Sequence, residues 1–355
     1  MTDLRDLLKR LSETFGPSGN EKAVRALIRA EIEGRVDRLD VDALGNLIAF
    51  KAGIGPEPRL KVLLAAHMDE VGFMITKINK DGTLAFSAPS VDARLLLAKR
   101  VRIGEPGVPG VICAPVPHLQ KGDSAHRVLD ADDLFIDIGA ADEKFASAKV
   151  TLGDYATFAT SFSVLSEDPA WPTVRGKAFD DRAGCAALVA LLAGDEAYPV
   201  DLYAAFTVQE EVGLRGARVV AHRVAPDAAF ALEGTICDDL PRPPDEDSTP
   251  VTRVGDGPAI TLMDRSLVSH PGLLALLKET AEETGLAVQY KAPGLGGTDA
   301  GAMHLAREGV PAIAVATPCR YIHGPAAILN LNDLQTLVSL VDGALRRIGP
   351  ANLSR

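Results

Sequence analysis

Four long apolar runs, separated by segments with helical spacing, constrain the fold of this 355-residue chain more than any other feature. The first, RLKVLLAAHMDEVGF, indicates a strand that is buried on both faces and ends at His67. The others cover 200–208, 227–232 and 309–317, and helical patterns such as DRAGCAALVALLAG, after Asp180, lie between them. Strands that alternate with helices predict an α/β fold, with a mixed, mostly parallel sheet and helices on both faces.

One region departs from this alternation. Residues 75–164 contain short runs of valine and isoleucine among many glycines and prolines, which is typical of a small β-rich module. A chain of this length is too long for one average core and suits two. We therefore predict an α/β domain formed by 1–74 plus 165–355, with 75–164 inserted into it.

Composition excludes several classes of protein. A net charge of -11 argues against binding to nucleic acid, which needs clustered lysine and arginine. The N-terminus lacks the apolar core of a signal peptide, and no window approaches the ~18 apolar residues of a membrane span. The four cysteines are far apart and form no C-x-x-C pair, so neither disulfides nor a zinc–thiolate site is expected. We expect a cytoplasmic protein that does not bind membranes.

Near the N-terminus, Ser18 and Glu21 have the spacing of a capping box. Val24, Ile28 and Ile32 follow at intervals that place them on one helical face. The pattern predicts a helix capped by Ser18.

Histidines and carboxylates follow the apolar runs. In open α/β sheets, ligands bind outside the carboxyl ends of the strands, so residues at those ends are candidates for chemistry. The candidates are His67 and Asp69 after the first run, Glu210 and Glu211 after the second, Glu233 after the third, His323 after the fourth, and Asp180 with Asp181 where a helix begins.

Each candidate has an ordinary explanation when it is taken alone. A single histidine at a strand end is usually structural, a pair of glutamates is usually solvated, and Asp180 would by default be a helix N-cap. Their joint occurrence at four strand ends is much harder to explain in this way. Crowded carboxylates repel one another, and cations between them relieve that repulsion.

The residue types narrow the choice of cation. Histidines with carboxylates and no thiolate suit Zn²⁺, Co²⁺ or Mn²⁺. Two histidines and three carboxylates exceed the needs of one tetrahedral ion, and they fit two ions ~3.5–4 Å apart that share a carboxylate and a water molecule. The chain has no H-E-x-x-H helix, no G-x-S-x-G elbow and no Walker lysine.

The motifs AHMDEVGF, KAFDDRAG, QEEVGLRGA, GGTDAGAMHLAREGVP and RYIHGP, in this order, resemble the M42 family of metalloaminopeptidases, which includes the tetrahedral (TET) enzymes. The resemblance spans nearly the whole chain. It includes the insertion, whose segments RVRIG, PGVI, PHL and IDIGA are similar to the family's PDZ-like dimerisation domain.

The resemblance implies a role for each candidate. Two divalent ions, Zn²⁺ or Co²⁺ with Mn²⁺ as a further option, would be held by His67, Asp180 and Glu233 and by Asp180, Glu211 and His323. Asp69 would orient His67. Glu210 would be the general base that takes a proton from a metal-bridging water, which then attacks the first peptide carbonyl.

The sequence departs from the family pattern at two positions. Glu233 stands where aspartate is more usual, and its extra methylene would shift the ion or alter its affinity. Asp181 replaces the more usual asparagine and would add charge near the bridging carboxylate.

The resemblance also implies partners. The substrates would be short peptides with free N-termini, and subunits would pair into dimers that assemble into a dodecamer, although the family includes smaller assemblies. The residue preferred at the peptide's N-terminus and the ion bound in the cell stay open.

Several residues near these motifs have a less specific interpretation. Thr298 and Asp299 match the family's G-G-T-D-A, but a glycine-rich turn with an Asx hydrogen bond explains them equally well. For His118 a structural role is expected. Lys177 and Arg182 are expected to pair with carboxylates rather than to act in catalysis.

Other functions remain as alternatives. The same two-metal chemistry would serve a carboxypeptidase or an amide deacylase. A glycoside hydrolase needs paired carboxylates around a sugar bond, and Trp171 is the chain's only tryptophan for a sugar platform. A non-catalytic assembly protein would have no reason to keep the whole candidate set.

Overall fold

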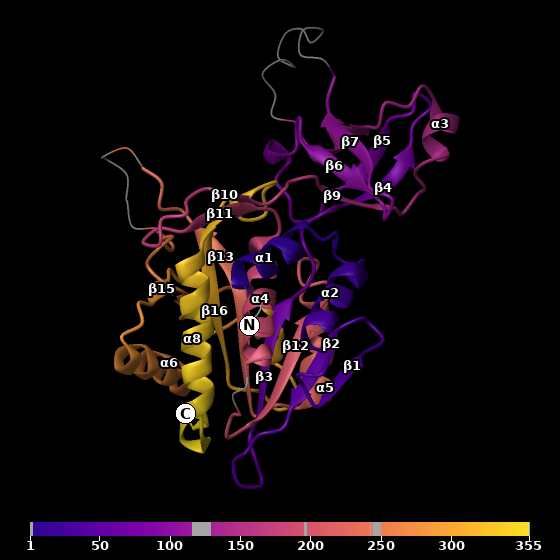
Figure 1. The fold of residues 1–355 in the computed structure, drawn as a ribbon. Coiled ribbons are helices and arrows are strands. Elements are labelled where there is room, and N and C mark those ends of the chain that lie inside the picture. Colours follow the sequence, from indigo (N-terminus) through magenta and orange to yellow (C-terminus); the bar gives the residue numbers. More distant parts are fainter. Residues whose placement is uncertain (1–2, 116–128, 195–196, 242, 244–249, 355) are drawn as a thin grey trace.

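The computed structural model describes residues 3–115, 129–194, 197–241, 243 and 250–354. They form a layered α/β part and a β-barrel that lies at one end of it (Figure 1). The strands of the α/β part are β1 (Arg38–Val41), β2 (Leu47–Lys51), β3 (Lys61–His67), β10 (Ser163–Val164), β11 (Thr173–Gly176), β12 (Asp201–Thr207), β13 (Ala228–Cys237), β14 (Ala259–Thr261), β15 (Gln289–Lys291), β16 (Ala312–Arg320) and β17 (Ala327–Asn330).

These strands form one eleven-stranded sheet in the order β1-β2-β12-β3-β13-β16-β17-β11-β10, with β14 pairing with both β15 and β16. Strands β12, β3, β13 and β16 are parallel and form the centre. Antiparallel strands complete both edges. The prediction of a mixed, mostly parallel sheet is confirmed, and its long central strands are the apolar runs of the sequence.

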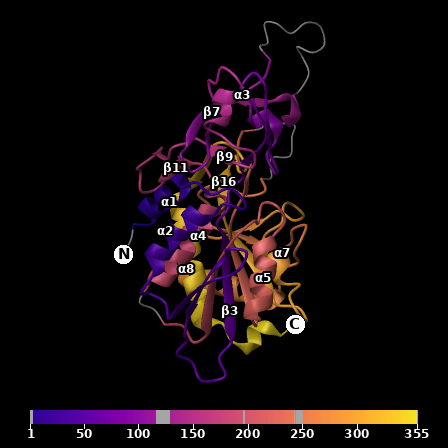
Figure 2. The same ribbon diagram turned by 90° about the vertical axis from the view of Figure 1, so that its right-hand side faces the viewer.

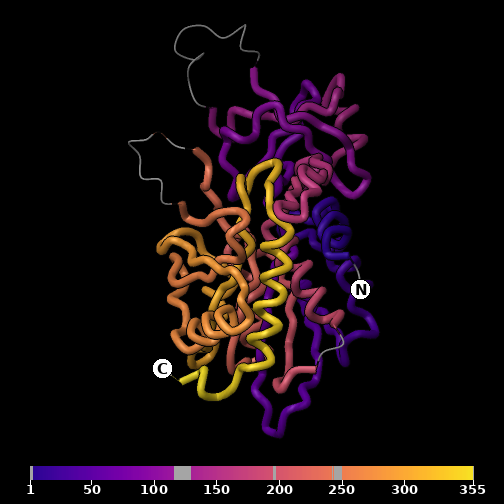
Figure 3. Tube along the Cα trace, turned by 60° about the vertical axis from the view of Figure 1, so that its left-hand side comes forward, coloured from indigo at the N-terminus to yellow at the C-terminus, as the bar shows by residue number. Residues whose placement is uncertain are grey.

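Helices cover both faces of the sheet (Figure 2). One face carries α1 (Leu4–Glu13), α2 (Lys22–Ile32), α4 (Phe179–Ala193), α6 (Pro271–Thr284) and α8 (Leu331–Arg347), and the other carries α5 (Arg215–Val224) and α7 (Asp299–Met303). The tube in Figure 3 shows α8 running along the length of the α/β part. Among the described helices, none combines the length and the apolar character needed to cross a bilayer.

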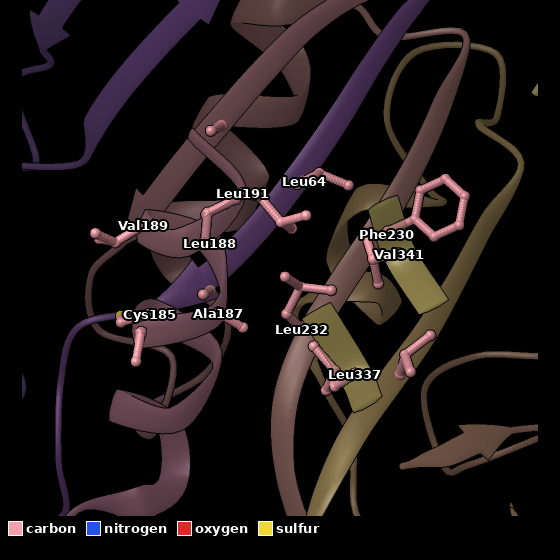
Figure 4. Packing of buried hydrophobic residues seen from close by; sticks show 14 of the residues in the cluster. Leu64, Cys185, Ala187, Leu188, Val189, Leu191, Phe230, Leu232, Leu337 and Val341 are labelled. Atoms are coloured by element: carbon pink, nitrogen blue, oxygen red, sulfur yellow. The ribbon is translucent and has the colours of Figure 1, made fainter. Parts of the chain in front are cut away.

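Helix α4 is the centre of the larger core. It is apolar nearly all the way round, as expected of a helix that is buried on all sides. Its Leu188 and Leu191 face Leu232 of β13 and Leu337 of α8 (Figure 4). Burial of each such side chain contributes roughly 1.5–3 kcal/mol, so the start of α4 is firmly positioned against the sheet.

The barrel closes in the order β4-β5-β8-β7-β6-β9. Its strands are β4 (Phe73–Ile78), β5 (Leu84–Ser87), β6 (Arg100–Ile103), β7 (Val108–Cys113), β8 (Phe135–Asp137) and β9 (Tyr155–Phe158), and the short helix α3 (Glu143–Ser147) packs beside it. It has its own core, in which Phe73 packs edge-on against Phe86 and Phe158.

A β-rich module therefore interrupts the α/β pattern, as predicted. The proposed domain boundaries, 1–74 plus 165–355 and 75–164, stay a prediction; the barrel strands lie within 73–158, and β10 pairs with β11 of the main sheet. His118 lies outside the described residues.

The predicted capping box is wrong. Helix α2 begins at Lys22, with Glu21 at the N-cap position and no side-chain cap. The hydroxyl of Ser18 instead donates to Asp69 Oδ2 at 2.6 Å, and Glu21 Oε1 accepts from the backbone N–H groups of Gly19 and Gln209. Ser18 and Glu21 thus bond to the distant residues Asp69 and Gln209 instead of forming the reciprocal cap.

Candidate active site

The predicted residues meet at one edge of the sheet. His67 is the last residue of β3, Glu210 and Glu211 follow β12, and His323 follows β16. The expectation for Glu233 is wrong in one respect, because it lies inside β13 and not after it. Strand β13 continues to Cys237 because its pairing with β16 continues beyond the end of the apolar run.

Asp180 lies between the two histidines. Its Oδ1 is 3.1 Å from His67 Nε2, and its Oδ2 is 3.3 Å from His323 Nε2. Glu233 Oε2 lies 3.6 Å from His67 Nε2, and Glu211 Oε1 lies 3.4 Å from His323 Nε2. Each histidine thus faces Asp180 and one glutamate.

Backbone carbonyls fix the tautomers of both histidines. His67 Nδ1 lies 3.1 Å from the carbonyl oxygen of Asp69, and His323 Nδ1 lies 3.2 Å from that of Ser90. A carbonyl oxygen only accepts, so each Nδ1 carries a proton and donates it. In the neutral rings this leaves the lone pair of Nε2, directed at the carboxylates, free to bind a cation.

Asp69 ties the site together. Its Oδ1 accepts from the backbone N–H of Glu210 at 3.0 Å, and its Oδ2 accepts from the N–H of Glu211 at 3.2 Å. Its Oδ1 is also 3.6 Å from His67 Nδ1, which lies nearer to the Asp69 carbonyl. One buried carboxylate therefore positions both glutamates and contacts the ring of His67.

The charges of the site are strongly coupled. Burial alone would lower the pKa of His67, but its hydrogen bonds to Asp180 and Asp69 and the charge of Glu210 raise it well above its usual value. Burial raises the pKa of Glu211 to about 7, with Asp180 adding to the increase and His323 opposing it. Burial also raises the pKa of Glu233, with the charges of nearby carboxylates adding to the effect.

The crowding of carboxylates around two imidazoles, together with these directions, indicates that the site is short of positive charge. Glu211 Oε1 is buried and accepts no hydrogen bond from the described residues, although His323 Nε2 is close to it. A divalent cation would compensate the clustered carboxylates and use the free oxygen. The residues present therefore fit a metal centre.

Two candidate groups of metal ligands have atoms within 4.8 Å of one another: His67, Asp180 and Glu211, and His67, Asp181 and Glu233. Asp181 is already engaged, because its Oδ1 accepts from Gly184 N at 2.8 Å and its Oδ2 accepts from His67 N at 3.1 Å. Asp181, and not Asp180, caps the regular part of α4, so the default interpretation of Asp180 as the N-cap is wrong. Asp180 has non-helical backbone angles and presents its carboxylate to the histidines.

The structure also places the residues around the candidate ligands. Asp299 forms no Asx turn. Its N–H donates to Glu233 Oε1 at 3.1 Å, and its Oδ2 accepts from Thr207 Oγ1. Asp299 therefore holds Glu233 in position.

Lys177 and Arg182 pair with a carboxylate, as predicted. Lys177 Nζ lies 2.5 and 2.6 Å from the two carboxylate oxygens of Glu70. Arg182 Nη2 lies 3.5 Å from Glu70, and its other nitrogens donate mainly to backbone carbonyls. This buried triad connects the segment that carries His67 to the start of α4.

A pocket of about 290 Å³ opens beside the candidate ligands. Its lining includes the candidate residues His67, Asp180, Glu210, Glu233 and His323. Thr298 and the two glycines before it also line the pocket. Two further lining residues, Lys291 and Thr235, were not predicted from the sequence. No local pattern marked Lys291 or Thr235, because each sits in a strand whose neighbours come from distant segments.

The chain resembles known proteins over most of its length. A family model described as M42 glutamyl aminopeptidase matches residues 45–340. The chain is 31% identical to a lysyl aminopeptidase of Pyrococcus furiosus, covering 98% of this chain and 99% of the relative, and 33% identical to a glutamyl aminopeptidase of Lactococcus lactis, covering 93% and 92%. These two relatives are named for residues of opposite charge.

Solved structures resemble the whole chain. A TET aminopeptidase from a marine sediment thaumarchaeote has a TM-score of 0.92 at 35% identity, covering 99% of this chain and 98% of that one. The TET1 peptidase of Pyrococcus horikoshii, described as assembling into a tetrahedron or a large octahedral shell, has a TM-score of 0.85 at 35% identity, covering 98% and 100%.

Proposed function

This chain belongs to the M42 glutamyl aminopeptidase family and is thus a peptide hydrolase, and we propose that it releases N-terminal residues from short peptides at a centre of two divalent cations. The observation that carries this proposal is the position of Asp180. Its two carboxylate oxygens face the Nε2 atoms of two different histidines, at 3.1 and 3.3 Å. A carboxylate shared between two cations needs this arrangement of donors.

The proposed ligands are those that the resemblance implies: His67, Asp180 and Glu233 for one cation, and Asp180, Glu211 and His323 for the other. Zn²⁺ or Co²⁺ suits these nitrogen and carboxylate donors best, and Mn²⁺ is a further option. Such cations supply Lewis-acid chemistry, which makes water more acidic and polarises the peptide carbonyl.

Glu210 is the proposed general base. Its carboxylate lines the pocket, and its Oε2 lies 3.9 Å from His67 Nε2. Burial and the charges of Asp299 and Glu211 raise its pKa well above the usual value, which favours uptake of a proton. Glu210 would take a proton from the attacking water and pass it to the leaving amine, while Asp69 holds the Glu210 backbone and orients His67.

The barrel is proposed to be a PDZ-like dimerisation module, with dimers assembling further into a dodecamer. The support is the whole-chain likeness to a peptidase described as forming a tetrahedron or an octahedral shell. A cytoplasmic location is proposed because the four cysteines are free, which suits a reducing compartment.

The test is digestion of short peptides, each with a free or an acetylated N-terminus, followed by mass spectrometry. Protein loaded with Zn²⁺, Co²⁺ or Mn²⁺ is compared with chelated protein and with the Glu210→Gln variant. Stepwise loss of residues from the free N-termini alone, abolished by the chelator and strongly reduced in the variant, is expected.

Other outcomes would replace the proposal. Loss of residues from the carboxyl end indicates a carboxypeptidase, and removal of the acetyl group indicates a deacylase. Full activity in the chelated protein would contradict the metal centre, and full activity of Glu210→Gln would contradict the assignment of the base.

A further inference from the structure

The pocket beside the candidate ligands contains a buried cation. Lys291, the last residue of β15, has a relative exposure of 4% and lines this pocket. A Cβ atom built on Gly296, another lining residue, would lie 3.5 Å from Lys291 Nζ. Within the described part of the chain its ammonium group makes no hydrogen bond and no ion pair. A buried lysine without a partner is costly to the fold, which calls for a compensating group.

Two hydroxyl groups in the same pocket are also without partners. Thr235 Oγ1, in β13, and Thr298 Oγ1, just before α7, are buried and make no hydrogen bond to the described residues. Both residues line the pocket together with Lys291. One ammonium group and two hydroxyls form a set of donors that suits a carboxylate.

The position of these donors relative to the candidate catalytic residues indicates which carboxylate they would bind. Glu210 and Glu233 line the same pocket as Lys291. A pocket of about 290 Å³ is at the small end of ligand sites and suits one residue. Because Glu210 and Lys291 line the same pocket, a first residue whose carbonyl carbon lies beside Glu210 can place its side chain in this space.

We propose that Lys291, with the hydroxyls of Thr235 and Thr298, binds the side-chain carboxylate of an N-terminal glutamate or aspartate and so makes this enzyme selective for acidic first residues. The proposal rests on the proposed aminopeptidase function and specifies its substrate class. Relatives named for lysine and for glutamate match the chain about equally well, so similarity alone does not decide the preference.

The selectivity follows from what other side chains would leave unpaired. A leucine in the pocket would leave the ammonium group and both hydroxyls buried without partners. A lysine or arginine would bring a second positive charge against Lys291. Asp264, Glu233 and Asp180 act on Lys291 electrostatically, but none of them forms an ion pair or a hydrogen bond with it. Asp264 Oδ1 instead accepts from the backbone N–H groups of Ser266 and Leu267.

The test compares kcat/KM for peptides that differ only in the first residue: glutamate, aspartate, leucine or lysine. The metal-loaded wild-type protein is expected to favour an acidic first residue over leucine by about 100-fold or more. Lys291→Met, which keeps the length of the side chain, should reduce the glutamate-to-leucine ratio about 100-fold, and Lys291→Glu should favour lysine. Lys291→Arg should keep the acidic preference.

The matched control is Lys278→Met, because Lys278 is an exposed lysine of α6 that pairs with Glu282 on the surface. Its glutamate-to-leucine ratio should equal that of the wild type. Thr235→Val and Thr298→Val remove one hydroxyl each at nearly constant volume and should each lower the ratio, which keeps the test decisive if Lys291→Met does not fold. Inhibition by free glutamate and by free leucine measures binding separately from catalysis. Glutamate should inhibit the wild type more strongly than leucine does, and this difference should disappear in Lys291→Met.

The outcomes separate this proposal from the one on which it rests. Cleavage of leucine or lysine peptides in preference to acidic ones would overturn the assignment while leaving the aminopeptidase intact. An unchanged glutamate-to-leucine ratio in Lys291→Met, Thr235→Val and Thr298→Val would do the same. Cleavage of none of the peptides by any metal-loaded form would overturn the proposed function itself.

Discussion

Replacing Glu70 by glutamine tests whether a buried ion-pair triad holds the active site together. Glu70 follows His67 by three residues, and its partner Lys177 precedes Asp180 by three, so the pair joins two segments that carry candidate ligands. Both side chains are at most 5% exposed, and Arg182 lies beside them. Glutamine keeps the shape of Glu70 but removes the negative charge, which leaves two buried cations without a counter-ion.

The expected loss of stability is about 3–5 kcal/mol, the usual range when one partner of a buried pair is removed. The loss of stability cannot exceed the cost of deprotonating Lys177, because a neutral lysine no longer needs a counter-ion. Burial already lowers the pKa of Lys177, while Glu70 raises it. A lysine with the ordinary pKa of 10.5 gives up its proton at pH 7 at a cost of about 5 kcal/mol.

Unfolding in urea, followed by circular dichroism, measures the loss in free energy of unfolding, and thermal unfolding measures the change in Tm. With about 2 cal/mol/K of unfolding entropy per residue, a loss of 4 kcal/mol lowers Tm by about 5 °C. Without Glu70 the folded protein holds the Lys177 proton more weakly than the unfolded chain does. Stability therefore rises with pH up to the unfolded pKa of 10.5, and the deficit shrinks in that direction.

A double-mutant cycle provides the control. Lys177→Met leaves Glu70 with Arg182, and the double variant Glu70→Gln/Lys177→Met should cost less than the sum of the single changes by about 2–3 kcal/mol. A deficit of Glu70→Gln below about 1 kcal/mol, or one that does not depend on pH, would refute the reasoning.

Three further predictions concern the candidate site. Burial lowers the pKa of Lys291, so Lys291 loses its charge at a pH below its ordinary pKa of 10.5. The ratio of kcat/KM for glutamate and leucine peptides should therefore fall as the pH rises towards 10.5. A ratio that does not change with pH would argue against a charged Lys291. Removal of the metal should lower the unfolding temperature, because a cation that binds only the folded state stabilises it by about 2.7 kcal/mol at a concentration of about 100 times its Kd. Calorimetry before and after reloading with Zn²⁺ measures the unfolding temperature. Equal temperatures would contradict a bound cation. Ser18→Ala removes the 2.6 Å hydrogen bond to Asp69 and should cost about 1 kcal/mol with a loss of kcat, whereas Ser339→Ala, on the exposed face of α8, should leave kinetics unchanged.

The features predictable from sequence are those with a local cause. Strands β3, β12 and β16 correspond to apolar runs, so their ends indicate where the segments that carry His67, Glu211 and His323 leave the sheet. Parallel strands bring these ends to one edge. The metal hypothesis needed only the residue types at those ends.

Features that depend on distant partners were not predictable. Ser18 has the spacing of a cap but bonds to Asp69, and Glu233 continues a strand because β16 pairs with it. Asp180 and Asp181 are adjacent, and only the folded structure shows that the second caps the helix while the first faces the histidines. Lys291 carries no local signal, because its burial depends on segments far away in the sequence.

The contact at Ser90 limits how independently the barrel and the α/β part of this protein can change in sequence. Ser90 lies between β5 of the barrel and the 3₁₀ turn Ala93–Leu95, and it accepts from His323 Nδ1 through its carbonyl and donates to the Glu211 carbonyl through its hydroxyl. The segment that follows β5 of the barrel therefore helps to orient His323, one of the proposed metal ligands. A chimera that exchanges barrels between relatives must rebuild this contact, because without it His323 Nδ1 loses the acceptor that orients its ring.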